Sequence, residues 1–127
     1  MYSDDNEITE KIIGAAIKVH RALDPGLLES AYQACLYYEL VKLGLRVEKE
    51  KPLPLVYEEV KLDCGYRIDL LVDGRIIVGL KSVESLTDIH MAQIISYLKL
   101  ADCQLGLLIN FNVTQLTKGI KRVVNNF

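Results

Sequence analysis

The stretch of sequence that decides the fold is Tyr66-Arg67-Ile68-Asp69-Leu70-Leu71-Val72-Asp73-Gly74-Arg75-Ile76-Ile77-Val78-Gly79-Leu80-Lys81. It consists of two apolar runs joined by Asp73-Gly74. Asp-Gly between two such runs is a strong signal for a β-hairpin, because a tight turn needs residues that tolerate a positive φ. Each run also carries a charge: Asp69 interrupts the first, and Lys81 ends the second. The sequence therefore predicts a central hairpin with a carboxylate and an ammonium group on paired strands.

Two helices are predicted before this hairpin. Apolar residues recur at helical spacing from Glu7 to Leu23, and Asp24-Pro25-Gly26 breaks the pattern. A second apolar face runs from Leu28 to Leu43, and Gly44 ends that helix. Both helices should therefore be complete before the chain enters its first strand.

The segment between the second helix and the hairpin is polar and contains prolines. Residues 45–51 are a candidate for a short polar strand. Pro52 and Pro54 surround Leu53, ahead of the apolar residues 55–57. Proline cannot donate a hydrogen bond to a sheet, so this pattern indicates an edge strand or a loop leading into one.

Helical periodicity returns after the hairpin. Residues 88–100 are predicted to form a helix, and residues 105–111 are a nearly continuous apolar strand of the kind buried on both faces. Residues 114–124 are predicted to form a final helix, with Lys118, Lys121 and Arg122 on its outer face. The order of elements predicts an α/β domain with a central mixed sheet and four flanking helices.

Length and composition fit one globular domain. The chain has 127 residues, half of them hydrophobic, so residues 1–127 are predicted to form a single domain with a real core. The net charge of −2 lacks the global basic character of many nucleic-acid binders, although a local basic patch is compatible with it.

The cysteines and the N-terminus indicate a cytoplasmic protein. The three cysteines, Cys35, Cys64 and Cys103, form no C-x-x-C motif, and each lies among apolar neighbours as a small core residue would. The acidic start, residues 1–5, does not resemble a signal peptide. No apolar run approaches the length that spans a bilayer, so no membrane partner is expected.

Asp69 and Lys81 are the candidates for chemistry. An acid and a lysine on paired strands can hold a metal ion and a water over a phosphodiester, where the metal lowers the pKa of the water and the lysine stabilises charge on phosphorus. Carboxylate oxygens suit Mg²⁺. The residues alone leave a second interpretation open, in which Asp69 and Lys81 form a structural ion pair or end their strands in water.

Five motifs follow one another along almost the whole chain. They are Gly26-Leu27-Leu28-Glu29-Ser30-Ala31-Tyr32, Lys61-Leu62-Asp63-Cys64-Gly65-Tyr66-Arg67-Ile68-Asp69, Val83-Glu84-Ser85-Leu86, His90-Met91-Ala92-Gln93 with Tyr97, and Gly106-Leu107-Leu108-Ile109-Asn110-Phe111. In these motifs and in their order the chain resembles the GxxExxY proteins, a compact branch of the PD-(D/E)XK nuclease superfamily. The resemblance implies a restriction-endonuclease-like core.

The resemblance also implies roles for particular residues. Asp69 corresponds to the metal-binding aspartate of the superfamily, and Lys81 to the lysine of its E-x-K element. Glu29 resembles a helical glutamate that completes the metal site in some branches, and the Leu80 carbonyl corresponds to a main-chain metal ligand. Gln93 and Tyr97 resemble the polar pair that positions substrate, and Tyr66 is expected to border the site.

Gly79 departs from the pattern of the relatives, which usually have Glu-Leu-Lys at positions 79–81. The missing carboxylate predicts weak Mg²⁺ binding and favours an impaired site. Three interpretations stay open. The domain binds without cutting; Glu29 or Glu84 replaces the carboxylate; or the glycine is a single-base change of a glutamate codon introduced in cloning or sequencing.

Two functions are therefore expected from the sequence. The first is a Mg²⁺-dependent nuclease-like domain that acts on phosphodiesters of DNA or RNA. The second is a catalytically inactive module that binds nucleic acid or protein, with a homodimer among its forms. Gly79 and the mild acidity of the chain motivate the second.

Overall fold

The central hairpin forms where the Asp-Gly signal predicts it. In the computed structural model, which describes residues 5–125, β4 (Arg67–Val72) pairs with β5 (Ile76–Lys81) in antiparallel fashion. Asp73 and Gly74 both have positive φ, 53° and 67°, and the Arg75 N–H donates to the Val72 carbonyl at 3.0 Å. The turn therefore has the left-handed residues that fit the twist of a tight hairpin.

This hairpin lies inside a five-stranded sheet with the order β1-β4-β5-β6-β7. The added strands are β1 (Val47–Pro52), β6 (Leu105–Asn110) and β7 (Ile120–Val124). The β5 and β6 strands are parallel, and the other neighbours are antiparallel. The predicted mixed sheet is confirmed, and the polar, proline-ended β1 is one of its two edge strands.

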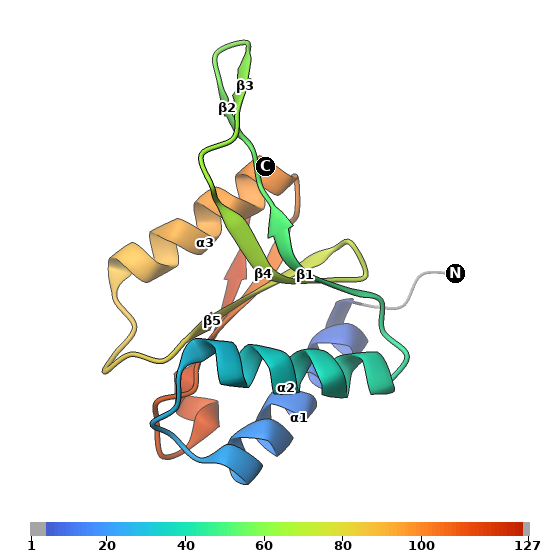
Figure 1. Cartoon of the computed structure of the whole chain (residues 1–127), viewed down its shortest axis with the longest axis vertical. Helices are drawn as coiled ribbons and strands as arrows, with labels where there is room; N and C mark the ends of the chain where they lie inside the picture. The colour runs from blue at the N-terminus through green and yellow to red at the C-terminus, as the bar shows by residue number, and fades with distance from the viewer. Residues whose placement is uncertain (1–4, 126–127) are drawn as a thin grey trace.

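Helices cover both faces of the sheet (Figure 1). The helices α1 (Asp5–Leu23) and α2 (Glu29–Lys42) share one core cluster with alternate residues of β4, β5 and β6. The helix α3 (Asp88–Ala101) crosses from β5 to β6 and packs in a second cluster on the opposite face. The central strands are buried on both sides, which explains why β6 is apolar at nearly every position.

The predicted final helix over residues 114–124 is wrong. Residues 116–119 form a single 3-10 turn, η1 (Leu116–Gly119), and the chain then pairs with β6 as the antiparallel strand β7. The β-branched residues Ile120, Val123 and Val124 suit a strand. A side chain at Gly119 would also collide with the Asn110 carbonyl, so the turn sits tightly against the end of β6. Residues 5–125 thus contain three α-helices and not four.

The apolar residues after Pro54 form a second, two-stranded sheet that the sequence did not predict. The strands β2 (Leu55–Tyr57) and β3 (Val60–Leu62) make an antiparallel hairpin that projects from the body, at the top of Figure 1. We call residues 55–62 the arm. Leu53, just before the arm, is buried in the core cluster beneath α3 and anchors its base.

The three cysteines differ in their surroundings. All are free thiols; Cys103 is buried and Cys35 half-buried, as expected of core residues. Cys64 is exposed after the arm, so its prediction as a core residue is wrong. No helix within residues 5–125 is long and apolar enough to cross a membrane. Of the acidic start at residues 1–5, which does not resemble a signal peptide, residues 1–4 lie outside the described part.

Candidate functional site

Asp69 lies where β4 and β5 separate. Their ladder extends from Val72 paired with Ile76 to Leu70 paired with Val78 and stops there. Beyond that point the Asp69 side chain takes over: its Oδ2 accepts a hydrogen bond from the Leu80 N–H at 2.8 Å. A half-buried carboxylate therefore replaces a main-chain acceptor at the opening of the hairpin.

Lys81 points to the face of the sheet that α3 covers. Side chains alternate along a strand, and Ile77 belongs to the core cluster of α3 whereas Val78 and Leu80 belong to the opposite cluster. Position 79 and Lys81 therefore share the side of Ile77. The Lys81 ammonium donates to Gln93 Oε1 at 3.2 Å, which joins β5 to α3.

Gln93 and Tyr97 lie one turn apart on α3, and both reach the site. The Tyr97 ring meets the Tyr66 ring edge-on, with centroids 6.0 Å apart and planes at 62°. Burial raises the pKa of Tyr97, and the Asp69 charge raises it further. The phenol is therefore protonated at neutral pH and can donate a hydrogen bond.

Two glutamates lie close enough for their charges to act on Asp69. Burial is the largest cause that raises the pKa of Asp69, and the charges of Glu50 and Glu29 raise it further. The Leu80 N–H and the Lys81 charge act in the opposite direction. The predicted residues Lys81 and Glu29 are thus both close enough to act on the charge of Asp69. Glu29 does so from the first turn of α2.

Glu50 is a candidate site residue that sequence reasoning missed. On β1, Lys49 pairs with Leu70 and Lys51 pairs with Ile68, which places Glu50 opposite Asp69. Glu50 has a left-handed φ of 52°, and its Oε1 accepts a hydrogen bond from Gln33 Nε2 at 3.1 Å. The alternating charges of β1 contain no signal that singles out Glu50, because only the pairing with β4 brings it to Asp69.

The glycine and the tyrosine of the Gly26 to Tyr32 motif shape the loop that delivers Glu29. Gly26 has a φ of 107°, and the buried Tyr32 hydroxyl donates to the Asp24 carbonyl at 2.6 Å and accepts from the Leu27 N–H at 3.1 Å. The Tyr32 ring also stacks on Phe111, with centroids 4.5 Å apart. Both residues therefore have structural roles that leave Glu29 at the start of α2.

The end of β5 is tied to the same loop. Ser82 Oγ donates to the Leu27 carbonyl at 2.7 Å, one residue beyond Lys81. The loop that carries Glu29 and the strand that carries Lys81 are therefore held together.

The backbone does not require glycine at position 79. A Cβ built there would lie 3.4 Å from Leu108 Cδ1 and 3.6 Å from Ile94 Cδ1, which are ordinary contacts, and the φ of Gly79 is not left-handed. A longer side chain would emerge on the same face as Lys81. Glu84 does not reach this place; it lines a different hollow together with Lys118 and Lys121.

A divalent cation fits this site only in part. No three of the His, Cys, Asp and Glu side chains in residues 5–125 are placed to hold a metal by themselves. Mg²⁺ needs less than that, because it usually binds one or two carboxylates together with waters and substrate phosphates. Asp69, under the repulsion of Glu50 and Glu29, offers the oxygen donors and the negative charge that such an ion prefers.

Comparison with known proteins agrees with the fold. Searches among curated proteins and among solved structures gave no match. The family model of the PD-(D/E)XK nuclease superfamily matches residues 6–123, nearly the whole chain. The five-stranded mixed sheet with helices on both faces is consistent with the restriction-endonuclease-like architecture of that superfamily. The chain therefore belongs to the PD-(D/E)XK nuclease superfamily.

Proposed function

We propose that this chain is a metal-dependent nuclease-like domain acting on nucleic-acid phosphodiesters, with an activity reduced by the glycine at position 79. The observation that carries the proposal is the convergence of Asp69, Lys81 and Gln93 at the opening of the β4–β5 hairpin. Burial and the charges of Glu50 and Glu29 raise the pKa of Asp69 and so disfavour its charged form. Such perturbed groups are characteristic of functional sites.

Asp69 and Glu50 are the residues that would hold Mg²⁺. Within a strand the N–H and C=O of one residue point to the same neighbour, so the Leu80 carbonyl faces the same side as the N–H that binds Asp69. Glu29 would contribute through space or through water. When bound, the ion would supply Lewis acidity and lower the pKa of an attacking water. Glu50 would thus partly compensate for the metal-binding carboxylate that is missing at Gly79.

Lys81 and α3 would act on the substrate. The Lys81 ammonium is held by Gln93 and would stabilise the negative charge that develops on the phosphoryl oxygens. Tyr97 keeps its proton at neutral pH and can donate it in a hydrogen bond to a phosphate or sugar oxygen. Tyr66, packed against Tyr97, offers an aromatic face to a base.

The local charge favours metal dependence over binding without a metal. Three carboxylates, Asp69, Glu50 and Glu29, face one ammonium group, Lys81. A site with this excess of negative charge repels a phosphodiester until a cation offsets it. The proposal thus expects both binding and cleavage at this site to require the cation.

An inactive binding module is the second candidate. It is favoured by Gly79 and by the lack, within residues 5–125, of any three side chains grouped to hold a metal. It predicts that a labelled oligonucleotide or a protein partner binds while no phosphodiester is cut. The assignment to the GxxExxY branch stays a prediction and is not needed for either function.

The test is a cleavage assay on labelled single- and double-stranded DNA and RNA, with Mg²⁺ or Mn²⁺ and with chelator. We would compare the unmodified chain with Gly79→Glu, Glu50→Gln and Lys81→Ala. Glu84→Gln is the matched control for Glu50→Gln, because Glu84 lies at another hollow. Lys99→Ala, at an exposed lysine in the last turn of α3, is the control for Lys81→Ala.

The expected pattern is weak metal-dependent cutting by the unmodified chain. Gly79→Glu should cut faster, Glu50→Gln should cut about tenfold to a hundredfold less, and Lys81→Ala should not cut. Cutting by Gly79→Glu alone would identify a disabled nuclease and turn attention to binding. If neither the unmodified chain nor Gly79→Glu cuts any substrate, the proposed activity is wrong.

A further inference from the structure

The arm presents an apolar face to solvent. Leu55 lies opposite Leu62, and Tyr57 lies opposite Val60, so all four side chains share one face of the two-stranded sheet. Three of them are largely exposed: Tyr57 by 65%, Val60 by 54% and Leu62 by 41%. An uncovered apolar face of this kind, on an element that projects from the body, is typical of an interaction surface.

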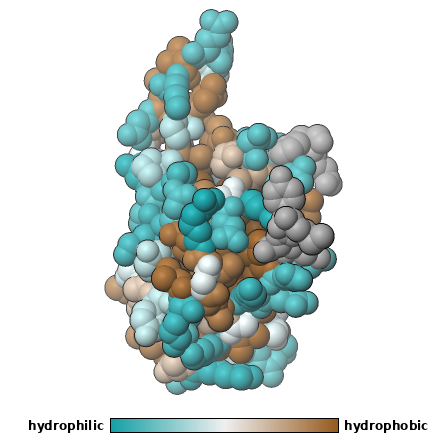
Figure 2. Space-filling model, turned by 90° about the vertical axis from the view of Figure 1, so that its right-hand side faces the viewer, coloured by the Kyte–Doolittle hydropathy of each residue, from teal (hydrophilic) through white to brown (hydrophobic). Residues whose placement is uncertain are grey.

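The rest of the chain does little to stabilise the arm. No helix or other strand in residues 5–125 packs extensively on β2 or β3, and an isolated two-stranded hairpin is marginal in water. Figure 2 shows hydrophobic residues along the projecting arm below a hydrophilic tip. The tip turn contains Glu58 and Glu59, both exposed. The arm therefore combines an apolar face with an acidic end.

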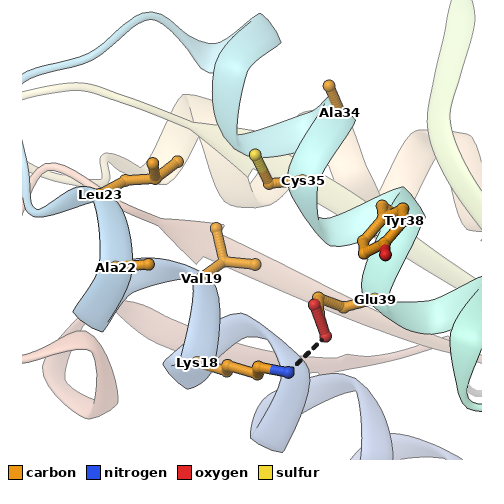
Figure 3. Close-up of a pocket in the computed structure, with 8 residues that line it drawn as sticks. All are labelled: Lys18, Val19, Ala22, Leu23, Ala34, Cys35, Tyr38 and Glu39. Atoms are coloured by element: carbon orange, nitrogen blue, oxygen red, sulfur yellow. Dashed lines mark hydrogen bonds and ion pairs between the residues drawn. The ribbon is translucent and has the colours of Figure 1, made fainter.

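A complementary surface lies at the other end of the molecule, between α1 and α2. Two adjoining hollows, of about 290 and 320 Å³, share Lys18 and Glu39 in their walls, and we call them together the α1–α2 groove. Figure 3 shows small and apolar side chains of both helices turned toward the first hollow. These side chains are Val19, Ala22, Leu23, Ala34, Cys35 and Tyr38.

The rim of the α1–α2 groove is basic. Lys11, Lys18 and Lys42 stand around it with a single acid, Glu39. Glu39 Oε1 lies 2.9 Å from the Lys18 ammonium and 3.6 Å from that of Lys42. One carboxylate cannot offset three ammonium groups, so the groove keeps an excess of positive charge around an apolar floor.

The arm and the groove match in chemistry but cannot meet within one chain. Figure 1 places the arm and the α1–α2 pair at opposite ends of the longest axis of the molecule. We propose that the arm of one copy docks in the α1–α2 groove of a second copy. The apolar face of the arm would cover the groove floor, and Glu58 and Glu59 would approach the lysine rim. An antiparallel, two-fold arrangement makes both contacts at once and closes the assembly as a dimer.

The acidic tip favours a protein partner over nucleic acid. An arm that enters a groove of DNA or RNA passes between phosphates, where Glu58 and Glu59 would be repelled and one lysine, Lys61, would remain to attract. The lysine rim of the α1–α2 groove has the opposite sign and fits the tip. Charge complementarity therefore selects a second copy as the occupant that the chain itself can supply.

Sedimentation velocity of the full chain over a wide range of concentration tests the contact. We expect a concentration-dependent dimer. Tyr57→Ser combined with Val60→Ser should raise the dissociation constant of the dimer by at least about tenfold, because exposed aromatic residues dominate such contacts. Circular dichroism and thermal melting would confirm that the variant folds. The control is Lys118→Glu on η1, which changes one exposed charge that lines neither the arm nor the α1–α2 groove.

A charge swap makes the test specific. Glu58→Lys with Glu59→Lys should weaken the dimer, and Lys11→Glu with Lys42→Glu should weaken it as well. The chain that carries all four changes should recover most of the affinity, since each tip again meets a groove of opposite charge. Recovery distinguishes a direct contact from two separate losses.

Several results would overturn this proposal. A monomer at every concentration excludes the contact. A dimer that is unaffected by the arm variants, or that fails to recover in the charge swap, uses another surface. Loss of oligonucleotide binding in the Tyr57 and Val60 variants, with the oligomeric state unchanged, would show that the arm contacts nucleic acid.

Discussion

Asp69 and Tyr57 lie on neighbouring parts of one chain, and each occupies the environment that suits it least. Asp69 is a carboxylate half-buried at the centre of the sheet, where burial and two glutamates oppose its charge. Tyr57 is an aromatic ring held in water by the arm. The surroundings of Asp69 disfavour its charged form, and those of Tyr57 leave its apolar ring uncovered. Both unfavourable placements are explained if Asp69 binds a metal ion and Tyr57 contacts a partner protein.

The largest expected effect is on catalysis. Lys81→Ala should lower cleavage by the Gly79→Glu variant by about a hundredfold to a thousandfold, the usual loss when one stabilising donor is removed from a site. The measurement is the initial rate on the best oligonucleotide substrate. Equal rates with and without the Lys81 ammonium would mean that Lys81 has only a structural role. The hairpin site would then not be a functional counterpart to the arm.

The next largest expected effect is a loss of stability when the buried, hydrogen-bonded hydroxyl of Tyr32 is removed. Tyr32→Phe leaves the Leu27 N–H and the Asp24 carbonyl without their side-chain partner. We expect the free energy of unfolding in urea to fall by about 1–3 kcal/mol. Tyr38→Phe, at an exposed tyrosine of the same helix, is the control and should leave it nearly unchanged. A similar loss in both would remove the special role of the motif tyrosine.

A smaller effect of opposite sign is expected at Asp69. Its pKa is raised in the folded state, so the folded protein binds a proton more tightly than the unfolded chain. Stability of the metal-free protein should therefore fall as the pH rises from about 4, the unfolded value, through the raised folded value. Asp69→Asn should lack this loss and melt a few degrees higher at neutral pH.

Thermal melting in chelator from acid to neutral pH checks this prediction. Asp73→Asn is the control, at an aspartate of the hairpin turn for which we expect no such gain, because its Oδ1 accepts from the Arg46 N–H. A lower melting temperature for Asp69→Asn at neutral pH would show that Asp69 is an ordinary structural residue.

The smallest expected effect is on the arm. Tyr57→Ser should change the free energy of unfolding of the monomer by less than about 0.5 kcal/mol, the usual range for a surface residue. Urea unfolding at a concentration below dimer formation is the measurement. A large fall in the free energy of unfolding would mean that the Tyr57 ring stabilises the body of the protein. Its position would then be explained without a partner.

Much of this fold follows from local sequence patterns. The Asp-Gly turn and the two apolar runs predict the β4–β5 hairpin, and helical spacing predicts α1, α2 and α3. Asp69, Lys81, Gln93 and Tyr97 come together because they lie on the hairpin and on the next helix. These elements are close in sequence, so their patterns carry enough information.

The rest depends on contacts between distant segments. Residues 120–124 form a strand because β6 offers an open edge, whereas their apolar spacing over so short a segment fits a helix equally well. Glu50 reaches Asp69 only through the register of β1 on β4. The pairing of β2 with β3 likewise joins two segments of three residues each, which are too short for their pattern to predict strands. No local pattern specifies these pairings.

The pair of hydrogen bonds between Arg46 and Asp73 limits where this chain can tolerate insertions and deletions. The Arg46 N–H donates to Asp73 Oδ1 at 2.9 Å, and the Asp73 N–H donates to the Arg46 carbonyl at 2.7 Å. This clamp fixes the start of β1, and four residues later the chain reaches Glu50. A deletion between them would shift the strand by one residue and turn each of its side chains to the other face. Insertions at the tip of the arm lie beyond Glu50 and leave that count intact. Length variation among related chains should therefore accumulate at the tip of the arm and be rare between Arg46 and Glu50.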